Sequence, residues 1–263
     1  MTDDASAPEA CVVSVGAAVL RVLTSLKMLG LHLFTIVLVV VMVNLAFWQL
    51  RRHNERVTFN DSVRARSLDA PRNVNELLAL SNDASRLEWY LLRESGEYLA
   101  NEDLLLVNLS QDGRAGVDPV SALRLDNGVV LLVNRGFIPL SEVVPAPPVG
   151  RVTIVGRVRA PQERRRGELT DAASGELREI QRIDPERLAA QLPGEVLPFY
   201  VDLLQSEPAD SPLLSRIAEP ELTVGPHLSY VVQWFVFSMC AVIAWAFIVR
   251  RALVAARRAP PST

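Results

Sequence analysis

Two long apolar segments dominate the hydrophobic pattern of this chain. Residues 29–50 and residues 226–249 run over 22 and 24 positions without a formally charged side chain. An α-helix rises about 1.5 Å per residue and needs roughly 20 apolar residues to cross the hydrocarbon core of a bilayer. The pattern therefore predicts two transmembrane helices.

The first apolar segment also has some features of a secretory signal peptide. Its apolar run is longer than the roughly 7–15 residues of a typical signal core, and no small-x-small cleavage motif follows it. The sequence FWQLRRHNERV, residues 47–57, follows instead. We therefore expect an anchor that is not cleaved.

The basic residues around the two segments indicate their orientation. Only Arg216 lies shortly before the second segment, whereas Arg250, Arg251, Arg257 and Arg258 follow it. Since positive residues accumulate on the cytoplasmic side, the C-terminus is predicted to be cytoplasmic. The arginines after the first segment favour the opposite orientation, but long loops are translocated largely regardless of their charge. We expect a protein of the cell membrane, in contact with membrane lipid, with both termini cytoplasmic.

Between the two segments the pattern changes to short apolar stretches separated by charges, glycines and prolines. Strands are predicted at residues 86–93, 103–109, 151–161 and 197–206. Residues 123–140 predict a hairpin that turns at Asn127-Gly128, a pair that favours positive φ at both central positions. Residues 71–81 predict a short helix with Pro71 in its first turn, and residues 184–192 predict another that is capped by Asp184.

These patterns together predict an α+β fold, in which two transmembrane helices flank an extracytoplasmic, mainly antiparallel β domain with short helices. The expected parts are a cytoplasmic N-terminal segment (1–28), the first transmembrane helix (29–50), the extracytoplasmic domain (51–225), the second transmembrane helix (226–249) and a cytoplasmic basic tail (250–263).

Composition excludes several kinds of chemistry. The chain has a net charge of −3 and only two cysteines, and it holds no CxxC, HExxH or GxxxxGK[ST] motif. No histidine lies between His53 and His227, so a Ser-His-Asp arrangement in the central domain would lack its base. The arginine run at 164–166 is typical of a solvated loop rather than of a lipid or nucleic-acid site. We therefore expect no catalytic residues and no nucleic-acid partner.

The candidate site lies at the outer ends of the two apolar helices. In the first helix, Trp48 is an interfacial aromatic residue, and Gln49, Arg52 and His53 follow at i, i+3 and i+4, on one helical face. Polar side chains within or beside a transmembrane helix tend to face protein, water or a ligand rather than lipid.

The second helix repeats this arrangement. His227, Tyr230 and Trp234 fall at i, i+3 and i+7 on one face, and the expected topology places His227 at about the depth of His53. Imidazole is a common haem ligand, and apolar aromatic walls suit a porphyrin. The alternative for His227 is an amphipathic residue that anchors the end of a helix. His32, at the inner end of the first helix, has no predicted role.

Four sequence blocks resemble the surfeit locus protein 1 family. FWQLRRHNERV is similar to its W-Q-L-x-R signature, and VLLVNRGFIP (130–139) to its V-N-R-G-W-V-P element. VTIVGRVR (152–159) resembles the following strand, and PHLSYVVQWFVFS (226–238) the start of its second helix. Their order and spacing agree over residues 40–245. The chain departs from the family pattern at Phe137, Asn108-Leu109 and Glu55-Arg56.

The resemblance implies a membrane-bound assembly factor for haem-copper cytochrome c oxidase. Such a protein would bind haem a, support its delivery to or retention in the catalytic subunit, and have oxidase subunits as partners. The resemblance places His227 at the position of the suspected haem-iron ligand of the family. The other candidate site residues come from helical spacing and the expected topology, and the resemblance gives His53 no support: Tyr230, Trp234, Trp48, Gln49, Arg52 and His53. Two alternatives remain open: a structural accessory subunit of an oxidase without haem, and, more remotely, a two-span sensor. The NRG tripeptide is expected to serve structure, with Arg135 paired and Gly136 at a bend.

Overall fold

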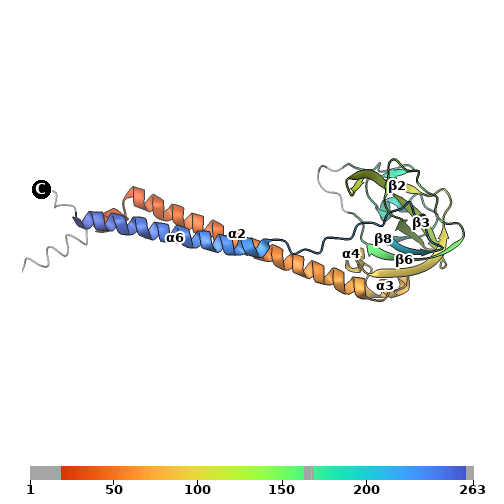
Figure 1. Cartoon of the computed structure of the whole chain (residues 1–263), viewed down its shortest axis with the longest axis horizontal. Helices are drawn as coiled ribbons and strands as arrows, with labels where there is room; N and C mark the ends of the chain where they lie inside the picture. The colour runs from red at the N-terminus through yellow and green to blue at the C-terminus, as the bar shows by residue number, and fades with distance from the viewer. Residues whose placement is uncertain (1–18, 163–166, 168, 259–263) are drawn as a thin grey trace, which may run out of the picture. The chain divides into compact units, whose positions relative to one another are not determined.

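The computed structural model describes residues 19–162, 167 and 169–258, and the chain divides into two compact units (Figure 1). The helical unit comprises Met1–Asn60 and Leu222–Thr263, and the sheet unit comprises Asp61–Glu221. The arginine run at 164–166 lies outside the described residues. The mixed α and β content that the sequence predicted is confirmed.

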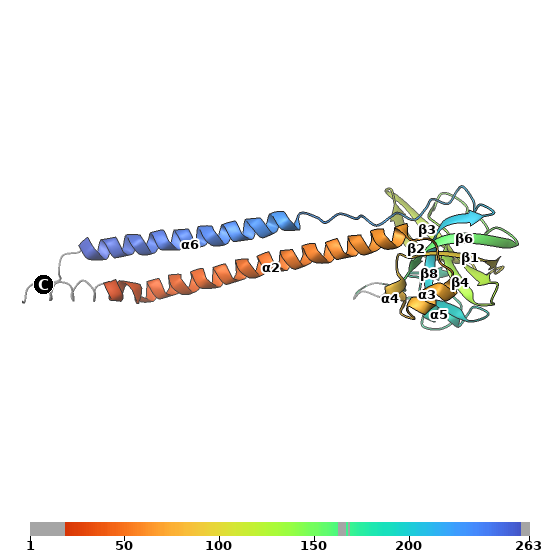
Figure 2. The same ribbon diagram turned by 90° about the horizontal axis from the view of Figure 1, so that it is seen from below.

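The helical unit consists of α2 (Leu26–Leu68), up to Asn60, and α6 (His227–Arg258). Both helices are long and apolar enough to cross a membrane, as predicted. They lie side by side and run antiparallel (Figure 2). Ala46 and Ser238, one on each helix, are buried, and small residues of this kind let membrane helices approach closely. Most of the apolar side chains of both helices are exposed, which suits a lipid environment.

Helix α2 continues for 18 residues beyond position 50, where the predicted span ended. The change in composition at Arg51 ends the apolar segment but not the helix, because no glycine or proline occurs between Gly30 and Pro71. An ion pair at i, i+3 spacing supports the charged half, with Arg52 2.8 Å from Glu55. The helix therefore extends well past its apolar part.

The described part of the sheet unit contains eight strands in one sheet. They are β1 (Leu91–Tyr98), β2 (Leu104–Gln111), β3 (Arg114–Leu125), β4 (Val130–Asn134), β5 (Ile138–Pro139), β6 (Arg151–Arg159), β7 (Glu179–Ile180) and β8 (Val196–Glu207). The order is β1-β6-β8-β4-β3-β2-β7, with β5 paired to β3. Because β1 also pairs with β3, strands β1, β6, β8, β4 and β3 form a closed ring. The pairing is mainly antiparallel, as predicted, except for the parallel pairs β2–β7 and β4–β8.

Two hydrophobic clusters cover opposite faces of the central strands. Alternate residues of β4 enter different clusters: Leu131 and Val133 pack with the first, Val130 and Leu132 with the second. The first cluster also takes Leu77 of α3 (Val74–Leu80), and the second takes Leu188 of α5 (Pro185–Ala189). Since β4 is buried on both faces, its sequence reads as a continuous apolar run rather than as an alternation.

The helix at residues 71–81 was predicted with the wrong start. Helix α3 begins at Val74, and Pro71 lies before it. Asn73 is the N-cap: its side chain accepts from the Glu76 N–H, and the Glu76 carboxylate accepts from the Asn73 N–H. This reciprocal capping box fixes the start of the helix. The prediction for α5 is confirmed, with Asp184 as N-cap and Pro185 in the first turn.

The strand predicted at 86–93 is wrong in its first half. Residues Ala84–Leu87 form the short helix α4, which Asp83 caps by accepting from the Ser85 N–H. The backbone then passes through Trp89 at φ 78° before β1 begins. The cap and the left-handed residue separate a helical turn from a strand within one apolar stretch, and the hydrophobic pattern alone does not reveal this.

The hairpin predicted at Asn127-Gly128 joins β3 and β4, but its turn differs from the expected type. Only Gly128 has positive φ (85°), and the Leu125 N–H donates to the carbonyl of Val129. The loop is thus longer than a two-residue turn. The pair with positive φ at both positions is Asp112 (52°) and Gly113 (74°), which join β2 and β3. The other predicted strands, at 103–109, 151–161 and 197–206, are confirmed as β2, β6 and β8.

Candidate functional site

The structure joins two of the predicted site residues by a hydrogen bond. His227 is the first residue of α6 and Gln49 lies in α2, and the His227 Nδ1 atom is 2.8 Å from the Gln49 Oε1 atom. An amide oxygen can only accept, so Nδ1 carries the proton and donates it to Gln49. The Nε2 atom of His227 is therefore left with its lone pair, as a metal ligand requires.

Gly225 lies beside this Nε2 atom. Its φ of +67° lies in the left-handed region that favours glycine, and a Cβ atom at this position would lie 3.4 Å from His227 Nε2. The turn before α6 thus places a residue without a side chain beside the free nitrogen. This tautomer of His227 fits a haem-iron ligand.

The remaining predicted site residues make local contacts. Trp48 and Tyr230 are 47% and 44% exposed, so their rings are available to lipid or to a ligand. Trp234 packs edge to face against Phe237, with ring centroids 6.1 Å apart. Arg52 pairs with Glu55 on its own helix. These residues share a region with His227, but among the described residues no hydrogen bond or ion pair joins them to its imidazole.

His53 is half-buried, and its Nδ1 atom is buried without a hydrogen-bond partner among the described residues. The sequence predicted that His53 lies at about the depth of His227. The residue that meets His227 is Gln49, one helical turn before His53.

A second contact between the same two helices joins His32 of α2 to Trp245 of α6. The sequence predicted no role for His32. The Trp245 Nε1–H donates to His32 Nδ1 over 2.8 Å, and the two rings meet edge to face at 5.7 Å. His32 therefore carries its proton on Nε2, the opposite tautomer to that of His227. The signal in the sequence was a histidine and a tryptophan at matching depth in two antiparallel spans.

The pair borders an apolar groove of about 340 Å³. Its lining residues are His32, Thr35, Ile36, Val39, Val40, Val242 and Trp245. The Thr35 hydroxyl donates to the Leu31 carbonyl of its own helix, so it offers no free proton to the groove.

In the sheet unit, the NRG tripeptide has the structural role that the sequence predicted. The Arg135 side chain is fully buried, and its guanidinium donates to both carboxylate oxygens of Asp210 over 2.8 and 2.6 Å. It also donates to the carbonyls of Pro145 and Ala146. Gly136 bends the chain at φ 127°. Arg135 thus ties two long loops to the end of β4.

A buried polar network that the sequence did not predict includes Asn134, the first residue of this tripeptide. The Asn134 amide donates to Asp118 over 3.0 Å, and Arg159 donates to Asp202 over 3.0 Å. Burial raises the pKa of the Asp118 carboxyl to about 7, although the Asn134 hydrogen bond opposes the rise. Burial also raises the pKa of Asp202, against the opposing effect of Arg159. These carboxyl groups come from strands β3 and β8, whose apolar pattern gave no sign of a shared polar site.

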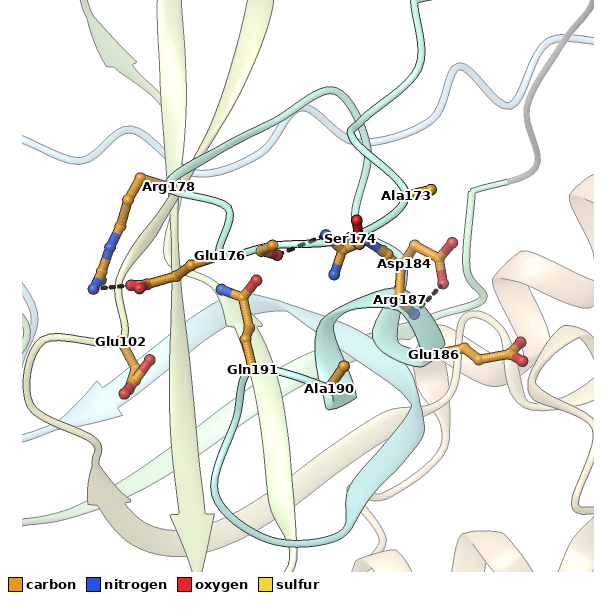
Figure 3. Close-up of a pocket in the computed structure, with 11 residues that line it drawn as sticks. Glu102, Ala173, Ser174, Glu176, Arg178, Asp184, Glu186, Arg187, Ala190 and Gln191 are labelled. Carbon is orange, nitrogen blue, oxygen red and sulfur yellow. Dashed lines mark hydrogen bonds and ion pairs between the residues drawn. The ribbon is translucent and has the colours of Figure 1, made fainter.

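A polar surface groove of about 1000 Å³ lies beside α5 in the sheet unit (Figure 3). Two of its arginines make local contacts: Arg187 donates to the carbonyls of Ala172 and Gly175, and Arg178 pairs with Glu176. The described residues contain no group of three or more side chains that would hold a metal ion.

The two units define a class of protein: a mixed α+β unit combined with two candidate membrane helices, of which the second begins at a histidine that is hydrogen-bonded to the first. The chain belongs to the SURF1 family, whose model matches residues 36–239. This confirms the family resemblance drawn from the four sequence blocks.

Individual relatives agree with this membership. Uncharacterized SURF1-like proteins of Mycobacterium bovis and Mycobacterium tuberculosis are 28% identical to this chain over 221 residues, which is 81% of this chain and 80% of theirs. A SURF1-like protein of Monosiga brevicollis is 26% identical over 242 residues, 84% of this chain and 88% of the relative. The family is generally linked to cytochrome oxidase assembly.

Proposed function

We propose that this protein is a membrane-anchored assembly factor for haem-copper cytochrome c oxidase and that it binds haem a. Its partners would be oxidase subunits, above all the catalytic subunit that receives or retains the haem. The single observation that carries the haem part is the hydrogen bond from His227 Nδ1 to Gln49, because it leaves Nε2 free to bind iron.

In this proposal the chain supplies ligation, orientation and an apolar surrounding, and redox chemistry is supplied by the haem when it is bound. His227 would hold the iron through Nε2. Trp48, Tyr230 and Trp234 would provide aromatic surface, since two of them are largely exposed on the helices and the third is half-buried. Arg52 and His53, on the same stretch of α2 as Gln49, would be polar partners for the haem propionates.

We further propose that both termini are cytoplasmic and that the sheet unit is extracytoplasmic, in a protein of the cell membrane surrounded by lipid. The four arginines after residue 249 support this orientation. The histidine at the start of α6 would then lie at the outer face of the membrane.

A structural accessory subunit without haem is the second candidate, and one observation favours it. The loop after β5 exposes apolar side chains of the sheet unit: Leu140, Val143 and Val149 are 69%, 84% and 97% exposed. Arg135 holds this loop in place through the carbonyls of Pro145 and Ala146. A fixed, exposed apolar loop suits contact with a partner protein.

The test is to express the full chain in cells that make haem a, purify it in mild detergent and record its visible spectrum. We expect haem to copurify with the wild type and to be lost from His227→Ala. The matched control is His32→Ala, which removes the other helix-to-helix histidine and should keep the haem. Haem retention by His227→Ala would refute the ligand role. If oxidase copurifies stoichiometrically with a protein that carries no haem, the accessory function is supported instead.

A further inference from the structure

We infer that Gln49 is the positioning residue that sets the tautomer and orientation of His227, and thereby makes Nε2 its ligating nitrogen. This inference rests on the proposed haem-binding function for its consequences. The protonation of Nδ1 itself is inferred only from the hydrogen bond between the two helices and does not depend on haem binding.

The hydrogen bond joins residues that are 178 positions apart in sequence, one on each helix. Gln49 lies inside α2, which no glycine or proline interrupts between positions 31 and 68, so the amide is presented by a continuous helix. His227 is the first residue of α6, where its backbone is least constrained by the helix. The rigid partner therefore determines the orientation of the imidazole.

The chemical consequence follows from the two nitrogens of imidazole. A metal needs a lone pair, and a neutral imidazole has only one nitrogen without a proton. When Gln49 accepts the Nδ1 proton, the lone pair is on Nε2, the atom next to Gly225. Outer partners of this kind fix the ring and raise the basicity of the ligand, and removing them typically costs about 10–100-fold in metal affinity.

His32 provides an internal contrast within the same two helices. Its Nδ1 accepts the Trp245 indole proton, so its own proton is on Nε2. Two membrane histidines are therefore held in opposite tautomers, one by an acceptor and the other by a donor. This difference explains why His227, and not His32, has an available ligating nitrogen at Nε2.

The first experiment needs no haem. The full-length protein is labelled with ¹⁵N-histidine, purified without haem in detergent micelles, and the two ring nitrogens of each of its three histidines are assigned by NMR. We expect the proton on Nδ1 in His227 and on Nε2 in His32. In Gln49→Leu, His227 should lose its Nδ1 proton preference, and in Gln49→Glu, which keeps an acceptor, it should retain it.

The second experiment measures haem affinity and the midpoint potential of the same variants. We expect Gln49→Leu to bind haem about 10–100-fold more weakly. Gln49→Glu should bind as the wild type does but with a lower midpoint potential, because a carboxylate makes the imidazole more electron-rich. The matched control is Gln233→Leu, since Gln233 is an exposed glutamine of α6. If Gln49→Glu keeps the haem affinity of the wild type, a loss of affinity in Gln49→Leu is not caused by misfolding.

The outcomes separate this inference from the proposed function. An Nε2 proton on wild-type His227, or an unchanged His227 tautomer in Gln49→Leu, would overturn the inference even if haem binds. Equal haem affinity and equal potential in wild type and Gln49→Leu would overturn it as well. If the tautomers are as expected but the wild type binds no haem, the proposed function falls, and the role of Gln49 in ligation falls with it.

Discussion

Burial controls the charge state of Asp118 in the sheet unit. Its carboxyl has a pKa of about 7, whereas an unfolded chain would release the same proton near pH 4. Between these values the folded protein binds more protons than the unfolded chain. The stability that the protonated Asp118 contributes is therefore fully present below about pH 4 and is lost as the pH rises to about 7.

We therefore expect the free energy of unfolding of the sheet unit to fall between about pH 4 and pH 7, by at most on the order of 4 kcal/mol from Asp118. In Asp118→Asn the fall should be smaller, because the amide stays neutral and can still accept from Asn134. Urea denaturation of the full-length protein in detergent measures this, followed by the fluorescence of Trp89, the tryptophan of the sheet unit.

The control for this measurement is Asp126→Asn, which removes an exposed carboxylate paired with Arg151. It should leave the pH dependence nearly as in the wild type. Parallel curves for the wild type and Asp118→Asn would show that Asp118 does not titrate in this range.

Single residues also show where sequence reasoning reaches its limit in the site. The periodicity of polar residues identified Gln49 and His227 as members of one outer region, because each residue type is unusual beside a long apolar run. Their mutual hydrogen bond was not predictable, because it depends on the relative rotation of two helices far apart in sequence. His32 was missed for the same reason, since its partner Trp245 reads as one more apolar residue.

At the scale of secondary-structure elements, the contact between β3 and β5 depends on a glycine. A Cβ atom at Gly116 would lie 2.3 Å from the Ile138 carbonyl oxygen and 2.4 Å from the ring of Phe137, which is fully buried. Phe137 stands where the family pattern has tryptophan, and its ring occupies the space that Gly116 leaves. The missing side chain is thus what lets these strands meet.

We predict that Gly116→Ala destabilises the sheet unit by about 1–3 kcal/mol, because neither the carbonyl nor the buried ring can move away freely. Ala115→Ser, at the exposed neighbouring position, should change the stability by less than about 0.5 kcal/mol. The same urea denaturation measures both. If Gly116→Ala is as stable as the wild type, β3 and β5 can move apart to accommodate the added Cβ atom without a measurable loss of stability, and the prediction is wrong.

The elements that the sequence predicted well are those with a strong local pattern: the two apolar helices, the long strands β2, β6 and β8, and α5 with its Asp184 cap. The two-residue strand β7 was missed because its pairing with β2 comes from tertiary contact, not from local preference. The helical continuation of α2 was missed because charge was read as the end of a helix, although charge ends only its apolar part.

At the scale of the whole molecule, the proposed topology makes a prediction about labelling. In a background without Cys11 and Cys240, Val149→Cys in the sheet unit should react with a membrane-impermeant maleimide in sealed right-side-out vesicles. Ala255→Cys near the end of α6 should react only after the vesicles are opened. The reverse pattern would place the sheet unit in the cytoplasm and refute the orientation, although the two helices would remain candidate spans.

The position of β8 in the sheet has a consequence for how the protein is made. This strand is the last of the chain, yet it lies between β6 and β4. Strands β1 to β6 leave the ribosome earlier, with no partner for one edge of β4 and one edge of β6 until β8 arrives. The ring can close only after Glu207 has been synthesised, shortly before α6 begins at His227. A nascent chain that stalls before this point exposes two unpaired strand edges, which makes it prone to aggregation and a ready substrate for chaperones.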